Sequence, residues 1–161
     1  MKIFGNLQWF EGATQKANVN SDGSSSLIPF TDWTPVTFNA GNFTANGSMT
    51  WTVEVGDVAT YKYSIIGKIM FLQFNLNATT VGGTPNTLLY VAIPGGKTCA
   101  SETYHYCEVL QISQTGWQVG LVALSPSGSV VNVFRDLSTA TNWAANTNAT
   151  YVRGSIWFPI N

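Results

Sequence analysis

The segment from Val58 to Leu76 constrains the fold of this chain more than any other. Its two halves are rich in β-branched and aromatic residues, and they meet at Gly67-Lys68, a pair suited to a tight turn. From Met70 to Leu76 an apolar side chain stands at every other position. Because successive side chains of a strand point to opposite faces, this alternation predicts a strand with one buried face. We therefore predict an antiparallel hairpin over 58–76.

Short β-rich segments of the same kind recur along the rest of the chain. From Met49 to Val55, for example, the apolar residues again fall on one face. Turn-forming residues separate the segments, among them the stretch from Thr79 to Pro85 and that from Ser138 to Asn148. The remaining predicted strands are 33–38, 88–93, 107–113, 117–124, 129–134 and 151–158. Many short strands at close spacing predict an all-β sandwich or barrel.

The composition favours a single domain that associates with other protein surfaces. A chain of 161 residues suits one domain and can bury a sizeable core. Only 9% of its residues are charged, against about 25% in ordinary globular proteins. Aromatic residues make up 13%. With so few charges available to cover a surface, we expect part of the aromatic surface to be buried between subunits.

The distribution of charge argues against nucleic acid and membrane as partners. The net charge is −1 and the basic residues stand singly, so the chain has no basic patch for nucleic acid or anionic lipid. No apolar run is long enough to span a bilayer, and the segment Met1 to Asn6 lacks the apolar core of a signal peptide. Reduced thiols are therefore expected at Cys99 and Cys107, with a disulfide between them as the alternative.

Residues 1–32 differ from the rest and are predicted to form an N-terminal arm. The stretch from Gly12 to Ser26 is polar, and its composition cannot bury enough surface to fold alone. The first ten residues are more apolar and could form a strand. The candidate docking residues of this arm are Phe4, Leu7, Trp9 and Phe10. Such side chains would invite aggregation on a free tail, but they suit a strand added to the edge of a partner's sheet.

The residues that could support catalysis or metal binding are too few to define a site. The only histidine, His105, is near Cys107 and between Glu102 and Glu108. Zinc needs three or four protein ligands in a set geometry, and a cysteine nucleophile needs a placed base and an orienting group. Two glutamates at this spacing do not define a glycosidase pair. We therefore predict no catalytic residues, no metal and no cofactor.

Aromatic residues are the better candidates for ligand contact. Sugars stack their apolar faces on aromatic rings while polar groups orient the hydroxyls. Tyr104 and Tyr106 are predicted to lie in a loop, and Trp143 is close to several asparagines. These three residues are the candidate ligand contacts. The other tryptophans of the strand patterns, Trp33, Trp51, Trp117 and Trp157, are interpreted as core or subunit contacts.

The order of several motifs resembles a known family. A Trp-x-Pro motif begins at Trp33, a Tyr-x-x-x-Gly-Lys turn ends at Lys68, and an apolar segment ends in Pro94-Gly95-Gly96. The chain closes with the sequence from Arg153 to Phe158. This order is similar to the head domains of tailed-phage virion proteins, which look like the trimeric jelly rolls of tumour necrosis factor and the complement globular heads. The resemblance covers about 33–161, and the chain has no long shaft before this head.

The resemblance implies a single jelly-roll sandwich at 33–161, preceded by the 1–32 arm. It further implies a non-enzymatic homotrimer on the surface of a phage virion, made in the host cytoplasm. The arm would dock on the major capsid protein or a tail protein, so that the trimer decorates or stabilises the capsid. Two alternatives remain open: a tail-tip receptor-binding protein that recognises a host glycan, and a free carbohydrate-binding lectin.

Overall fold

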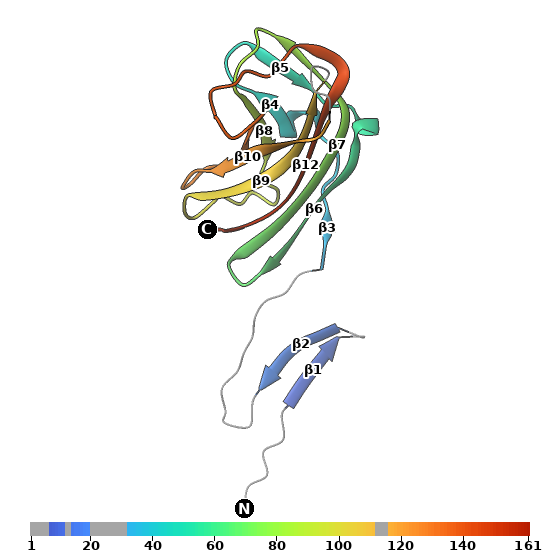
Figure 1. Ribbon diagram of the computed structural model, residues 1–161. Helices are drawn as coiled ribbons and strands as arrows, with labels where there is room; N and C mark the ends of the chain where they lie inside the picture. Colours follow the sequence, from blue (N-terminus) through green and yellow to red (C-terminus); the bar gives the residue numbers. More distant parts are fainter. Residues whose placement is uncertain (1–6, 12–13, 20–31, 112–115) are drawn as a thin grey trace, which may run out of the picture.

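The computed structural model describes residues 7–11, 14–19, 32–111 and 116–161, and these are built almost wholly of antiparallel strands (Figure 1). The all-β class is therefore confirmed. In this part of the chain helix is limited to two short 3-10 turns, η1 (Ala40–Asn42) and η2 (Val55–Asp57). The strands are β1 (Leu7–Glu11), β2 (Thr14–Val19), β3 (Thr34–Pro35), β4 (Phe43–Ala45), β5 (Met49–Thr52), β6 (Val58–Ile66), β7 (Ile69–Gly83), β8 (Leu88–Ala92), β9 (Thr103–Gln111), β10 (Gln118–Leu124), β11 (Val130–Phe134) and β12 (Asn146–Pro159).

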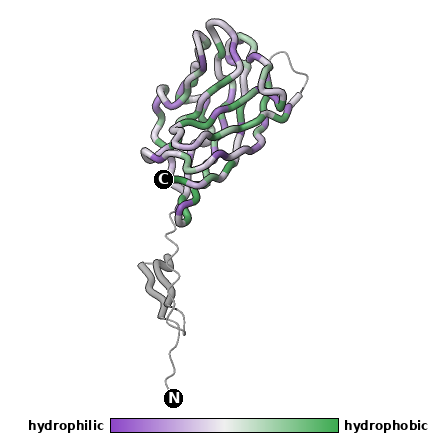
Figure 2. The backbone as a smooth tube through the Cα atoms, turned by 90° about the vertical axis from the view of Figure 1, so that its left-hand side faces the viewer, coloured by the Kyte–Doolittle hydropathy of each residue, from purple (hydrophilic) through white to green (hydrophobic). Residues whose placement is uncertain are grey.

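The predicted hairpin is confirmed as β6 and β7. The turn places Gly67 at a φ of 60°, in the left-handed region that glycine adopts at little cost. Pairing then runs from Ile66 opposite Ile69 to Tyr61 opposite Phe74 and beyond. The even-numbered apolar residues of β7 from Met70 to Leu76 are buried, as the alternation predicts. Polar and apolar residues alternate in the same way along other strands (Figure 2).

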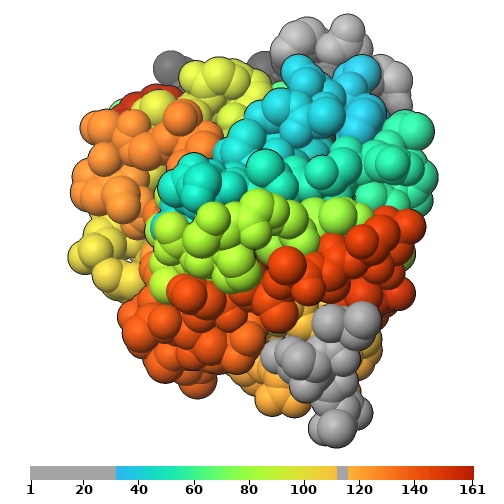
Figure 3. Space-filling model, turned by 90° about the horizontal axis from the view of Figure 1, so that it is seen from above, coloured from blue at the N-terminus to red at the C-terminus, as the bar shows by residue number. Residues whose placement is uncertain are grey.

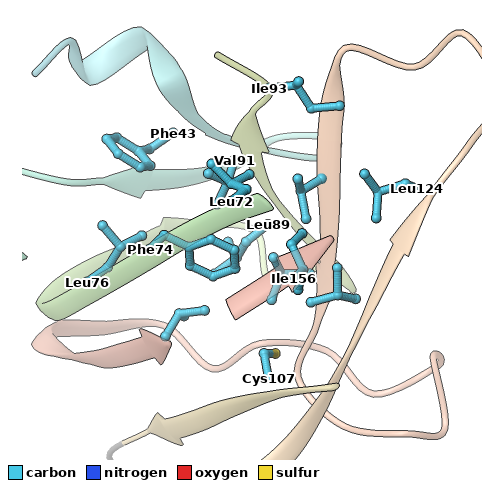
Figure 4. Packing of buried hydrophobic residues seen from close by; sticks show 14 of the residues in the cluster. Phe43, Leu72, Phe74, Leu76, Leu89, Val91, Ile93, Cys107, Leu124 and Ile156 are labelled. Atoms are coloured by element: carbon cyan, nitrogen blue, oxygen red, sulfur yellow. The ribbon is translucent and has the colours of Figure 1, made fainter. Parts of the chain in front are cut away.

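Ten strands form one curled antiparallel sheet, the sheet of a jelly-roll sandwich. Its order is β3-β6-β7-β12-β9-β10-β11-β8-β4, and β5 pairs with β7. The curl follows from β4 and β5, which are close in sequence. β4 pairs with β8 at one end of the order, whereas β5 pairs with the far end of β7 near the other. The sheet thus folds over on itself and encloses a core (Figure 4).

The core is apolar, and a few hydrogen bonds connect its walls. Phe43 packs edge-on against Trp51 and at a tilt against Tyr61. The Tyr61 hydroxyl donates to the carbonyl of Ala92 on the facing wall. Trp51 Nε1 donates to Thr79 Oγ1 over 2.8 Å. These bonds satisfy the polar tips of large rings that would be costly to bury unpaired.

One end of the sandwich is covered by segments that are far apart in sequence. The loop before β12 lies beside the β4–β5 region and the turn after β7 (Figure 3). Trp143 in this loop is fully buried; its backbone nitrogen donates to Asn86 and its Nε1 to Thr87. The side chain of Gln111 both donates to and accepts from the backbone of Ala144. Two sets of hydrogen bonds therefore hold this loop in place, those of Trp143 and those of Gln111.

Several predicted boundaries are wrong, each for a reason of pairing. The predicted loop from Thr79 to Pro85 is mostly strand, because β5 and β12 both pair with that end of β7. β4 was not predicted from the sequence, and it forms because it pairs with the edge of β8. β9 begins at Thr103, so the predicted loop of Tyr104 and Tyr106 is strand as well. Of the predicted strand 33–38, only β3 forms.

The N-terminal segment forms a small sheet of its own. β1 and β2 pair with each other and, among the described residues, with no strand of the large sheet. A strand near the N-terminus was predicted, but β2 falls in the stretch predicted to be an unstructured linker. Leu7, Trp9 and Phe10 lie in β1, whereas Phe4 lies outside the described residues. The division into an arm and a head stays a prediction.

Cys99 and Cys107 are both buried free thiols. Cys99 forms an isolated bridge with Ile160, and Cys107 lies on the inner face of β9. Within the described ranges no helix is long and apolar enough to cross a membrane.

Candidate binding face and groove

The outer face of β7, β12, β9 and β10 carries most of the exposed large side chains. On these strands the inward residues form the core and the alternate residues point outward. Tyr104 is 58% exposed and Tyr106 68% exposed. The other large apolar residues exposed in this region are Trp117, Val119 and Trp157. Aromatic rings on a sheet face are a common means of contact with ligands and partners.

Two neighbouring strands part in the middle of this face. The pairing of β12 with β9 ends where Arg153 stands opposite Glu108. Beyond that point β12 continues to pair with β7 as far as Pro159, but no longer with β9. The two strands come together again where His105 Nε2 donates to the carbonyl oxygen of Trp157 over 2.6 Å. The ring of His105 also packs edge-on against Trp157.

An open groove of about 390 Å³ occupies the place where the strands part. Four strands supply its walls and floor. Its lining residues are Gln73, Phe74, Asn75, Tyr106, Cys107, Glu108, Val119, Arg153, Gly154 and Ser155. The lining thus combines two charged groups, several amide and hydroxyl groups, and an exposed aromatic ring.

The floor depends on a residue without a side chain. A Cβ added to Gly154 would come within 2.3 Å of Phe74 Cζ. Real Cβ atoms do not approach carbon so closely, so the ring of Phe74 occupies the space that a side chain at 154 would need. Gly154 therefore allows the core ring to support the groove from below.

Arg153 is held in place on three sides. Its Nε donates to Asn75 Oδ1 over 3.0 Å and its Nη2 to Asn77 Oδ1 over 3.5 Å. Its guanidinium group lies 4.1 Å from the centre of the Trp117 ring, a favourable cation–π arrangement. Trp117 in turn packs edge-on against Tyr151. A planar group fixed in this way keeps its remaining donors in a defined position.

The structure separates the three predicted ligand contacts. Tyr106 lines the groove. Tyr104 points out from the same strand but is not part of the groove lining; it donates to Glu102, and this bond raises the pKa of Tyr104. Trp143 is wholly buried, so its prediction as a ligand contact is wrong: the loop that carries it folds inward, and its ring completes the core.

The cluster around His105 offers no arrangement for nucleophilic catalysis. Burial, together with the charge of Glu108, raises the pKa of Cys107 to about 12 against a weaker opposing bond from Gly120. A thiol with so high a pKa is not ionised near neutral pH, so it is a poor nucleophile. The ring of His105 is already engaged with Trp157. In the ranges that the structure covers, no three His, Cys, Asp or Glu residues group together as metal ligands.

Sequence reasoning missed the polar half of the groove. Gln73 and Asn75 alternate with the buried residues of β7, and this pattern could have marked a polar outer face. Arg153 likewise alternates with buried residues along β12, so its outward position could have been predicted in the same way. The parting of β9 from β12 has no sequence signal, because each strand by itself shows an ordinary alternation.

The fold and this face define a class: an all-β jelly-roll domain with an exposed aromatic surface and a polar groove. No known protein family, curated protein or solved structure matches the chain.

Proposed function

We propose that the chain is a non-enzymatic protein of a phage virion surface, a homotrimer that decorates or stabilises the capsid through its N-terminal arm. The observation that carries the assembly part is an apolar groove at one edge of the large sheet. It lies between β3 and β6, close to the point where the arm enters the head. The placement on a virion is supported by the motif order described above.

The edge groove has a volume of about 360 Å³ and is lined mainly by apolar residues. Its lining residues are Pro35, Val36, Phe38, Val55, Val58, Ala59, Thr60, Tyr61 and Lys62. Val55 is 70% exposed, an unusual state for a large aliphatic residue beside other apolar groups. Trp33, beside the groove, is also exposed, and Lys62 lies 4.8 Å from the centre of its ring.

A second copy of the chain is the occupant that fits this groove best. Among the residues that the structure describes, Lys62 is the only charged one in the lining, so a partner surface would have to be apolar and nearly uncharged. This chain, with 9% charged residues, has such surfaces. β3, which pairs with Lys62 and Tyr63 of β6, is the outermost described strand on this side of the sheet order, and an edge strand is where a strand from another chain can add.

Light scattering on the intact chain tests the assembly. At micromolar concentration the mass should be three times the 17.4 kDa of one chain. Val55→Asp should shift the protein to monomer, because it buries a charge at the contact. Leu137→Asp, which changes an exposed apolar side chain outside this groove, should leave the trimer intact. A wild-type protein that is monomeric under these conditions contradicts the proposal.

A second candidate is the recognition of a host glycan at a tail tip. The observation that favours it is the polar groove between β9 and β12, which is distinct from the apolar edge groove. A protein partner would meet mostly apolar residues at the edge, whereas the groove on the sheet face offers mixed donors and acceptors.

A further inference from the structure

We infer that the groove between β9 and β12 is a saccharide site for an uncharged pyranose, with Tyr106 as its stacking wall. The inference rests on the second candidate function and names its site and ligand class. It does not depend on whether the chain forms a trimer.

The shape of the groove suits a small cyclic ligand. Its volume of about 390 Å³ lies in the lower part of the range of about 300–1,000 Å³ that small-molecule sites occupy. It includes Arg153 and Glu108, which stand opposite each other at the last residue pair that joins β12 to β9. Past this pair, Gly154 and Ser155 line the groove and pair with β7 but not with β9. Main-chain groups of successive strand residues point to alternate sides, so one of these two residues turns its amide and carbonyl toward the groove.

The lining chemistry matches hydroxyl groups. Each sugar hydroxyl both donates and accepts, so a site for several hydroxyls needs a mixture of partners. Glu108 accepts, Ser155 does both, and the Gln73 amide does both. The Asn75 oxygen already accepts from Arg153, which leaves its amide nitrogen as a donor. These groups converge from three different strands on one space.

The charges of the groove favour an uncharged ligand. Glu108 and Arg153 stand opposite each other in register, and within the described part of the chain they are the only charged residues of the lining. An acidic sugar would meet the carboxylate as well as the guanidinium, and two of the guanidinium nitrogens already donate to Asn75 and Asn77. The groove as a whole has no net charge to attract an acid or a base.

The exposed ring of Tyr106 supplies the apolar contact. It is 68% exposed, and Val119, which stands on β10 opposite Glu108, also lines the groove. Pyranose rings carry a face of C–H groups that packs on such a ring. Arg153 and Asn75 are fixed by their mutual bond, so little ordering is needed when a ligand enters.

Saturation-transfer NMR on the full chain tests the site. The probes are the methyl glycosides of glucose, galactose, mannose and N-acetylglucosamine, with those of glucuronic acid and sialic acid as charged comparisons. At least one neutral glycoside should bind. Tyr106→Ala should weaken its binding about tenfold, the loss expected for one aromatic contact. Glu108→Gln should weaken it as well, since an acceptor oxygen is replaced by a donor.

Tyr104→Ala is the matched control, because it removes an exposed tyrosine from the same face of the same strand outside the groove. It should leave binding unchanged. No binding of any neutral glycoside at millimolar concentration overturns the inference, as does binding that Tyr106→Ala leaves unchanged. Light scattering on the same samples separates the two proposals: a trimer that binds no glycoside refutes this site alone.

Discussion

At the scale of single residues, Gly154 allows the core and the groove to meet. The ring of Phe74 fills the space above the residue on the core side, and the groove opens on the other. A side chain at this position would push on a ring that is itself packed on all sides.

Gly154→Ala is therefore expected to lower the free energy of unfolding by about 1–3 kcal/mol, the usual cost of overpacking a core. Urea unfolding measures the change. Gly56→Ala is the control, because a Cβ there meets nothing within 4 Å. It should stay within about 0.5 kcal/mol of the wild type. Equal stability of the two variants would show that Phe74 can move aside at no cost.

Individual residues were the hardest part to predict from the sequence. Tyr106 and Trp143 both stand among polar neighbours, yet one lines an open groove and the other is fully buried. The difference is made by the bonds of Asn86, Thr87 and Gln111 to the loop that carries Trp143. Those partners are distant in sequence, so no local pattern reveals them.

At the scale of elements, β9 carries a buried ionisable group with a pH signature. The Cys107 thiol lies inside the sheet, and burial raises its pKa from an ordinary value of 9.0 to about 12. The unfolded chain therefore loses this proton at lower pH than the folded one. The stabilising contribution is complete below pH 9 and is lost as the pH rises toward 12.

We expect the wild type to lose about 1.4 kcal/mol more stability between pH 8 and pH 10 than Cys107→Ala does. Denaturant unfolding at several pH values measures this difference. Burial also raises the pKa of Tyr61. The wild type and Cys107→Ala therefore both lose further stability at higher pH, and this loss cancels in the comparison. If the free energy of unfolding changes with pH in the same way for the wild type and for Cys107→Ala, the pKa of Cys107 is not raised.

Elements with one buried face were predictable, and elements defined by their partners were not. β6 and the first half of β7 follow from alternation and a glycine turn. The second half of β7 contains Gly82 and Gly83, which read as a turn in the sequence. This half of β7 is nevertheless a strand, because β5 pairs with one of its edges and β12 with the other. Such long-range pairing outweighs local propensity.

At the scale of the whole molecule, the large sheet and the β1–β2 hairpin are separate in their pairing. An isolated two-stranded hairpin is marginally stable in water, so it gains from docking on another surface. This favours the proposal that the arm is the element of attachment.

Deletion of residues 1–26 should leave a folded, trimeric head that no longer binds virus particles. The core supports this expectation, because it is built from Phe43 onward. Circular dichroism and light scattering check the head, and cosedimentation with particles lacking the protein checks attachment. If the truncated head binds with unchanged occupancy, the attachment surface is on the jelly roll.

The position of β12 in the sheet has a consequence for synthesis on the ribosome. β12 is the last of the ten strands to be translated, yet it lies between β7 and β9 and pairs with both. Until it emerges, β7 and β9 each expose an edge in the nascent chain, and such edges are prone to wrong pairing. A ribosome that stalls before Asn146 would therefore present two open edges at once, and release of that product would feed aggregation rather than a smaller folded head.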